Sequence, residues 1–150
     1  LEETDGKVII WAVYRYDIQE IERTLGEKYG KESVATYYGD TKDNLRQSIV
    51  DRFMDADDDL RFFVGNPKTG GYGLTLTSSH TVVYYSNDYS LEVRLQSEDR
   101  AHRIGQTSKV TYVDLMADHT IDEKIVKALN AKIDLASQVM GEDPKKILFG

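Results

Sequence analysis

Residues 7–25, KVIIWAVYRYDIQEIERTL, decide the fold, because the hydrophobic period changes within this one segment. Its first part, residues 7–13, is a continuous apolar run rich in β-branched residues, which indicates a strand buried on both faces. Its second part has apolar residues at helical spacing, Ile18, Ile21 and Leu25, with charged residues between them. A buried strand that runs directly into an amphipathic helix is typical of α/β proteins.

The same alternation continues along the chain. Further strands are predicted at residues 33–38, 60–64, 81–85 and 110–115. Further helices are predicted after Thr41, over residues 91–102 and after Thr120, with both threonines as N-caps. The predicted fold class is therefore α/β, a mostly parallel sheet with helices on both faces, and such sheets bind ligands at the carboxyl ends of their strands. Residues 1–150 form one domain in this prediction, with 1–6 and 142–150 peripheral.

Composition excludes several kinds of site. The chain has 150 residues, 40% hydrophobic and 30% charged, which suits one globular domain with a sizeable core. It has no cysteine, so disulfides and thiolate metal sites are excluded, and its three histidines show no metal-ligand spacing, so no metal site is predicted. No apolar run is long enough to span a membrane, and no membrane contact is predicted. The acidic first residues do not form a secretory signal, and the chain is interpreted as a fragment of a longer protein.

The net charge of −7 argues against an independent DNA-binding domain, because affinity for nucleic acid comes largely from Lys and Arg. Much of the acid is clustered at residues 55–59, DADDD, which is interpreted as a solvated loop rather than a metal site. A basic face elsewhere on the domain remains compatible with this composition.

Residues 96–106, QSEDRAHRIGQ, carry the sharpest chemical pattern. On a helix, Gln96, Arg100 and Arg103 project from one face, since they are four and seven residues apart. Arginine is always charged and binds oxygens in a planar fork, so this row suits a polyphosphate. The alternative is a solvated face that forms salt bridges with neighbouring acids.

Residues 65–73, GNPKTGGYG, follow the third predicted strand at its carboxyl end. Gly70, Gly71 and Gly73 can adopt positive φ and bring backbone N–H groups close to a phosphate, and Lys68 adds a charge. The segment is not a Walker A loop, and no pair of adjacent acids follows an apolar strand to hold Mg²⁺. If ATP is the ligand, this chain therefore supplies only part of the site; a plain turn is the alternative.

These segments resemble the Swi/Snf-type ATPases of helicase superfamily two. QSEDRAHRIGQ is similar to the family's motif VI, and residues 68–86, KTGGYGLTLTSSHTVVYYS, to its motif V and the strand after it. Residues 7–21 resemble motif IV, residues 37–53 the segment that follows it, and residues 117–129, ADHTIDEKIVKAL, the helix that closes this lobe. Similarity in five segments in the family's order covers residues 7 to about 140.

The resemblance implies a RecA-like three-layer sandwich that forms the second lobe of an ATP-driven motor. Arg100 and Arg103 match the family's arginine fingers, and Gln96 matches a γ-phosphate or interlobe contact. ATP with Mg²⁺ would be held mainly by an N-terminal RecA-like lobe of the same protein, so the isolated fragment would be inactive.

The matched glycines, Gly70, Gly71 and Gly73, couple the nucleotide to the nucleic-acid backbone in the family. The resemblance implies that Lys68 and Thr69 contact nucleic acid, most simply duplex DNA. Whether the parent unwinds strands or only translocates, and whether RNA replaces DNA, stays open.

Two segments depart from the family pattern. Residues 66–69 read NPKT where the family has Ser-Thr-Arg-Ala, and residues 86–91 read SNDYSL where it has Asp-x-x-Trp-Asn-Pro. We interpret these departures as a divergent viral or bacterial branch, which predicts an intracellular protein in the cytoplasm of a prokaryote or a virus-infected cell rather than in a nucleus.

Two other functions are alternatives to the motor lobe. A non-catalytic docking module is disfavoured by the intact arginine row, since a decayed site should have lost it. A doubly wound sugar-nucleotide transferase that uses the glycine loop for a diphosphate is disfavoured because the chain has no second acidic or histidine-bearing site.

Overall fold

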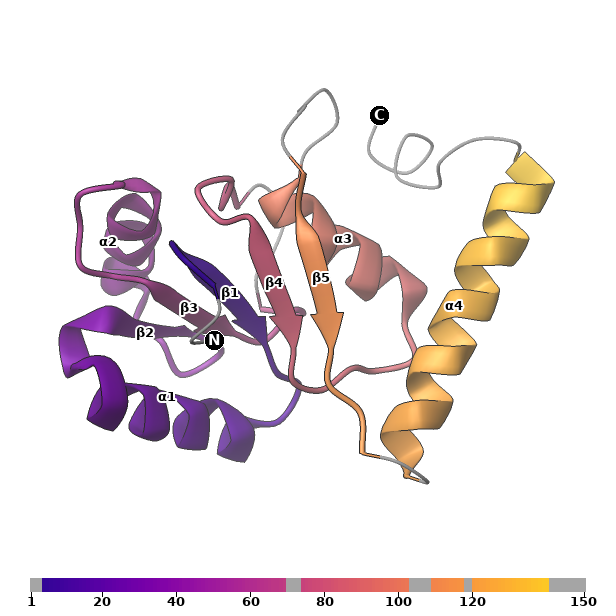
Figure 1. Cartoon of the computed structure of the whole chain (residues 1–150), viewed down its shortest axis with the longest axis horizontal. Helices are drawn as coiled ribbons and strands as arrows, with labels where there is room; N and C mark the ends of the chain where they lie inside the picture. Colours follow the sequence, from indigo (N-terminus) through magenta and orange to yellow (C-terminus); the bar gives the residue numbers. More distant parts are fainter. Residues whose placement is uncertain (1–3, 70–73, 103–108, 118–119, 141–150) are drawn as a thin grey trace.

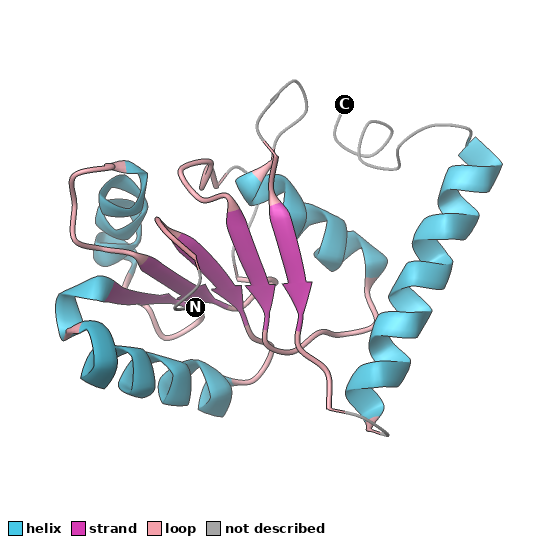
Figure 2. Cartoon of the chain, in the orientation of Figure 1, coloured by secondary structure: helices cyan, strands magenta, loops and turns pink. Residues whose placement is uncertain are grey.

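The structure is a computed structural model that describes residues 4–69, 74–102, 109–117 and 120–140 (Figure 2). Five parallel strands form one sheet in the order β2-β3-β1-β4-β5 (Figure 1). The strands are β1 (Val8–Trp11), β2 (Val34–Tyr37), β3 (Phe62–Gly65), β4 (Thr81–Tyr84) and β5 (Thr111–Asp114). The helices are α1 (Arg15–Tyr29), α2 (Asp43–Met54), α3 (Leu91–Ala101) and α4 (Ile121–Met140), with a 3-10 turn η1 (Lys31–Ser33). The predicted α/β fold with a parallel sheet is confirmed.

Strand β1 lies at the centre of the sheet, as its unbroken apolar sequence requires. It pairs with β3 on one side and β4 on the other, so that Ile10 is opposite both Val64 and Val83. All four residues of β1 are buried. A strand with neighbours on both edges and helices over both faces exposes none of its side chains to water. This explains why apolar and polar residues do not alternate along β1.

Two separate apolar clusters lie on the two faces of the sheet. Ile9 and Trp11 point into a cluster that includes Phe53 of α2 and Ala101 of α3. The alternate residues of β1 point into a second cluster that includes Ile18 and Leu25 of α1. Helix α1 therefore covers one face, while α2 and α3 cover the other, which gives the three layers. Helix α4 packs beside α3 (Figure 1).

The predicted N-cap at Thr41 is wrong. Helix α2 begins at Asp43 with Lys42 in the capping position. The hydroxyl of Thr41 instead accepts from the Tyr38 backbone N–H at 3.0 Å and donates to the Thr36 carbonyl at 3.1 Å. Threonine hydroxyls stabilise turns by the same bonds that cap helices, so the residue type alone does not distinguish the two positions.

Thr120 directly precedes the first residue of α4, as predicted. Its hydroxyl donates to the Ala117 carbonyl at 2.6 Å.

Gly65, at the end of β3, has no room for a side chain. An added Cβ would lie 2.9 Å from the Tyr37 carbonyl oxygen and 3.0 Å from Cζ3 of Trp11. We expect Gly65→Ala to lower the free energy of unfolding by about 1–3 kcal/mol, because strand backbone or a buried ring must move. Urea denaturation measures this, with Gly39→Ala as the control because a Cβ there meets nothing within 4 Å. Equal effects at the two glycines would contradict the packing at Gly65.

Candidate functional site

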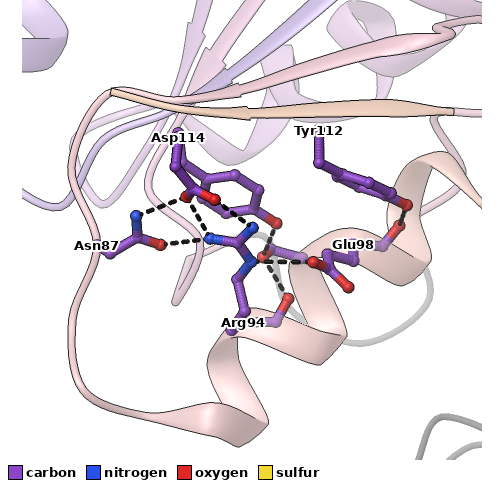
Figure 3. A network of polar contacts seen from close by, with 7 residues as sticks. Asn87, Arg94, Glu98, Tyr112 and Asp114 are labelled. Atoms are coloured by element: carbon purple, nitrogen blue, oxygen red, sulfur yellow. Dashed lines mark hydrogen bonds and ion pairs between the residues drawn. The ribbon is translucent and has the colours of Figure 1, made fainter. Parts of the chain in front are cut away.

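Helix α3, which carries the first part of the arginine motif, begins at the carboxyl edge of the sheet. The hydroxyl of Ser90 accepts from the Val93 backbone N–H at 3.3 Å and caps the helix. Arg94, in the first turns of α3, contacts Asp114 at the carboxyl end of β5 (Figure 3). Glu98, one turn later in α3, lies nearer the start of β5, where its carbonyl accepts from the Tyr112 hydroxyl at 3.2 Å (Figure 3). The helix therefore runs antiparallel to the strands, and its last residues lie toward the strand beginnings.

Arg100, the second residue of the predicted row, is buried. It is 5% exposed, and it lies in the last turn of α3. The segment that leads into β4 covers this turn, since the Leu76 backbone N–H donates to the Arg100 carbonyl at 2.8 Å. Helical spacing correctly put Arg100 on the same helix as Gln96, but it carried no information on the segment packed against that turn.

Gln96 lies one turn earlier and is only half-buried. Its side-chain amide donates to the Glu92 carboxylate at 3.2 Å. Arg103, the third member of the predicted row, lies outside the described residues, as do Gly70, Gly71 and Gly73.

Lys68 and Thr69 lie just beyond the carboxyl end of β3, where the glycine loop begins. Asn66 shapes this turn: its side-chain oxygen accepts from the Lys68 backbone N–H at 2.9 Å, and its amide donates to the Val13 carbonyl at 3.0 Å. The Lys68 ammonium group forms an ion pair with Asp88 at 3.0 Å and is 61% exposed. An exposed pair of this kind contributes little stability, so Lys68 can exchange its partner for another anion.

The glycine loop connects two distinct places. Its described flank at Thr69 lies at the carboxyl edge, whereas its other described flank leads to Leu76, which is hydrogen-bonded to the last turn of α3. The segment that follows the glycine loop therefore contacts the helix that carries the arginine motif, through the hydrogen bond between Leu76 and Arg100.

The most extensive polar network of α3 is centred on Arg94, which the sequence reasoning missed. Its guanidinium group donates to both oxygens of Asp114, at 2.6 and 3.1 Å, to the Asn87 side-chain oxygen at 2.9 Å and to Glu98 at 3.0 Å (Figure 3). It also stacks over the ring of Tyr84, 3.6 Å from the ring centroid. The network joins α3 to the ends of β4 and β5.

Burial sets the electrostatics of this network. Desolvation alone would lower the pKa of Arg94, but the Asp114 carboxylate and its other partners outweigh it and raise that pKa, which keeps the guanidinium charged. Burial also raises the pKa of Tyr84 and of Tyr112. The Tyr84 hydroxyl lies 2.7 Å from Ser97 Oγ. Each of the three guanidinium nitrogens of Arg94 has a structural partner, which marks the residue as a brace rather than a ligand-binding residue.

One signal in the sequence could have identified this brace. Arg94 and Glu98 are four residues apart on the predicted helix, the spacing of an intrahelical ion pair. Asp114, at the end of an otherwise apolar strand, is the acid that such a helix would meet.

Tyr89 is 45% exposed in the loop between β4 and α3. Its carbonyl accepts from the Lys132 ammonium group of α4 at 2.6 Å.

Within the described ranges, no group of three or more His, Asp or Glu side chains lies close enough to hold a metal ion. Among the helices of those ranges, none is long and apolar enough to cross a membrane.

Comparisons with known proteins all lead to one family, the helicases. The family described as helicase conserved C-terminal domain matches residues 1–105. The chain is 32% identical to the ATP-dependent helicase fft2 of Schizosaccharomyces pombe over 98% of its length, and 36% identical to Helicase SWR1 of Saccharomyces cerevisiae over 69%. It is also 36% identical over 68% of its length to snf22, a SWI/SNF chromatin-remodeling complex subunit of S. pombe. The chain spans only 11%, 7% and 6% of these three relatives.

A solved structure agrees with these relatives. The C-terminal part of the Fun30 ATPase domain superposes with a TM-score of 0.73 at 29% identity, over 83% of this chain and 39% of that one. The likeness extends over most of the described sheet and helices, so it supports the RecA-like lobe that the sequence predicted.

The expectation of a prokaryotic or viral cytoplasmic protein is wrong. The relatives named above are fungal, and snf22 is a subunit of a chromatin-remodeling complex, so they indicate a eukaryotic branch rather than a prokaryotic or viral one. The departures at residues 66–69 and 86–91 lie at loops after β3 and β4, and loops vary among relatives more readily than the strands that they follow.

The motif order, the parallel sheet and the matches therefore agree: the chain belongs to the helicase C-terminal domain family, as a RecA-like lobe of the type found in Swi/Snf-type ATP-dependent helicases.

Proposed function

We propose that this chain is the second motor lobe of a DNA-dependent ATPase that supplies arginine fingers to ATP bound by an N-terminal lobe. The observation that carries the proposal is the hydrogen bond between Leu76 and Arg100, at 2.8 Å. It ties the segment after the glycine loop to the helix end that leads into the arginine motif. A contact with DNA at one motif can thus be transmitted to ATP at the other.

The two arginines have different roles in this proposal. Arg100 is buried, so it reaches a phosphate only if closure of the lobes opens the contacts that cover it. Arg103 therefore takes the main role, and Arg100 supports it from the last turn of α3. Gln96, half-buried one turn earlier, contacts the facing lobe or the γ-phosphate.

In this proposal, the lobe contributes to catalysis by stabilising negative charge in the transition state. Phosphoryl transfer passes through a loose transition state with negative charge on the transferred group, and a positioned arginine stabilises that charge. The described residues do not fit a Mg²⁺ site, since they contain no cluster of carboxylates or histidines. In the proposal, Mg²⁺ and most of the ATP contacts belong to the N-terminal lobe, which explains why this lobe alone would be inactive.

The nucleic-acid contact is proposed at the carboxyl edge of the sheet, where Lys68 and Thr69 lie. We expect Lys68→Ala in the full-length protein to reduce the slope of log affinity against log salt for duplex DNA by about 1, because one phosphate contact is lost. Fluorescence anisotropy across a salt series measures this slope. Lys127→Ala is the matched control, since Lys127 is 73% exposed and also forms a surface ion pair, with Glu123 of α4. An unchanged slope in Lys68→Ala would place the DNA elsewhere.

The proposed function itself is tested by ATP hydrolysis in the full-length protein, with and without duplex DNA. We expect the rate to rise on addition of duplex DNA, and the 150-residue chain alone to show no hydrolysis above buffer. A full-length protein that binds duplex DNA but hydrolyses no ATP would instead support the docking module.

A further inference from the structure

The side chain of Lys68, the proposed contact for nucleic acid, already has an anionic partner. Its ammonium group lies 3.0 Å from a carboxylate oxygen of Asp88. Lys68 follows β3, whereas Asp88 belongs to the loop that joins β4 to α3. The Lys68 side chain is 61% exposed and the Asp88 side chain only 24% exposed, so a ligand reaches this pair from the side of the lysine.

The backbone that carries Lys68 is held by its own turn. The Asn66 side chain accepts from the Lys68 backbone N–H at 2.9 Å and donates to the Val13 carbonyl at 3.0 Å. The Thr69 backbone N–H donates to the Asn66 carbonyl at 3.1 Å, and the Asn66 backbone N–H donates to the Tyr37 carbonyl at 3.1 Å. Because the backbone is fixed, only the flexible side chain of Lys68 can change partners.

Asp88 is held in place without help from Lys68. One of its carboxylate oxygens accepts from the Ser90 backbone N–H at 2.7 Å, while the other faces Lys68. Ser90 caps α3, so this carboxylate lies beside the N-terminus of a helix, where negative charge is stabilised. Asn87, the preceding residue, accepts from Arg94 at 2.9 Å (Figure 3). Asp88 therefore keeps its position when Lys68 turns to another anion.

The turn after β3 and the loop before α3 are close-packed. Pro67 of the turn and Asp88, Ser90 and Arg94 of the other side line a cavity of only about 10 Å³. That space is at the lower limit for one water molecule, so a phosphate cannot enter between the two segments. A phosphate must instead approach from the solvent side, and the ammonium group of Lys68 must turn away from Asp88 to meet it.

We propose that Asp88 competes with the phosphate backbone of nucleic acid for the Lys68 ammonium group and thereby limits how tightly this lobe binds nucleic acid. A phosphate gains Lys68 only at the cost of the ion pair, and the carboxylate left behind then lies near a bound group of its own sign. A weak contact suits a motor that must release the backbone whenever it advances. The inference rests on the proposed nucleic-acid contact at Lys68 and names the residue that regulates it.

The test is the Kd of the full-length protein for duplex DNA, measured by fluorescence anisotropy at low salt. Asp88→Asn removes the charge but keeps a side-chain oxygen that can accept from the Ser90 N–H. We expect this variant to lower the Kd by about 3–5-fold, the upper range for an exposed ion pair. Asp88→Ser, which also keeps an acceptor oxygen, should show the same gain, so the result does not depend on one variant.

Asp43→Asn is the matched control. It removes the same charge from an acid that is 96% exposed at the start of α2, after the carboxyl end of β2, and that pairs with Arg46 rather than with Lys68. We expect its Kd to stay close to that of the unsubstituted protein. An equal gain in Asp43→Asn would show that any lost negative charge strengthens binding, which would overturn the proposal.

The second arm repeats Asp88→Asn in Lys68→Ala. Lys68→Ala alone should raise the Kd, and Asp88→Asn should then have a clearly smaller effect, because the lysine for which Asp88 competes is gone. The same gain with and without Lys68, or no gain from either Asp88 variant, would overturn the competition and leave the Lys68 contact standing. A Kd unchanged by Lys68→Ala would overturn the proposed nucleic-acid contact itself, and the competition with it.

Discussion

Arg103→Ala in the full-length protein is expected to lower the DNA-stimulated rate of ATP hydrolysis by about 10³-fold or more. The reason is that a finger acts on charge that develops only in the transition state, so its loss reduces kcat while ATP still binds. The measurement is steady-state hydrolysis at saturating duplex DNA, together with the Kd of a fluorescent ATP analogue. Arg103 lies outside the described residues, and its role comes from the motif that it shares with the family.

Lys109→Ala is the matched control for this prediction. Lys109 is an exposed cation six positions further along the chain, and no part of the proposal assigns it to ATP. A comparable loss in both variants would indicate a general electrostatic effect. A hydrolysis rate that survives Arg103→Ala would show that the motif is only structural here, and the docking module would then be the better interpretation.

Arg94→Met is expected to lower the free energy of unfolding by about 3 kcal/mol, a large share of the roughly 5–15 kcal/mol of a typical domain. Methionine keeps the apolar stem but removes the guanidinium group that balances Asp114, whose side chain is only 22% exposed. The carboxylate would then be left partly buried and unpaired, together with Asn87 and Glu98, which also accept from Arg94. Urea denaturation measures the change.

Arg23→Met provides the comparison, because Arg23 also forms ion pairs with two acids, Glu20 and Glu27, but on the exposed side of α1. Pairs of that kind contribute about 0–1 kcal/mol, so little change is expected. Arg94→Lys should recover only part of the loss, since an ammonium group cannot form the two-pronged contact with Asp114. If Arg94→Met and Arg23→Met unfolded at the same urea concentration, the brace would contribute nothing.

The order of strands and helices was predictable because the information is local. A strand such as β1, buried on both faces, must be apolar at every position, and the amphipathic α1 after it must show a period near 3.6. The strand bounds were predicted to within two residues for the same reason. The parallel arrangement followed from the alternation of the two kinds of element.

The environment of individual side chains was less predictable, because it depends on segments distant in sequence. Periodicity put Gln96 and Arg100 on one helix face, but the hydrogen bond to the Arg100 carbonyl comes from Leu76, 24 positions earlier in the chain. The brace at Arg94 likewise depends on Asp114, which is 20 positions further along. The periodicity of a single helix or strand specifies neither contact.

The burial of Trp11 has a practical consequence for experiments on this lobe. It is the only tryptophan of the chain, it is 0% exposed, and its ring meets Phe63 edge-on at the centre of the sheet. Within the described part of the chain, its indole N–H has no hydrogen-bond partner. Such an indole emits at short wavelength and shifts to the red when water reaches it, so intrinsic fluorescence reports directly on whether the middle strand has opened. The substitutions at Gly65, Arg94 and Arg23 leave this chromophore in place, so in the 150-residue chain these variants share the same optical probe.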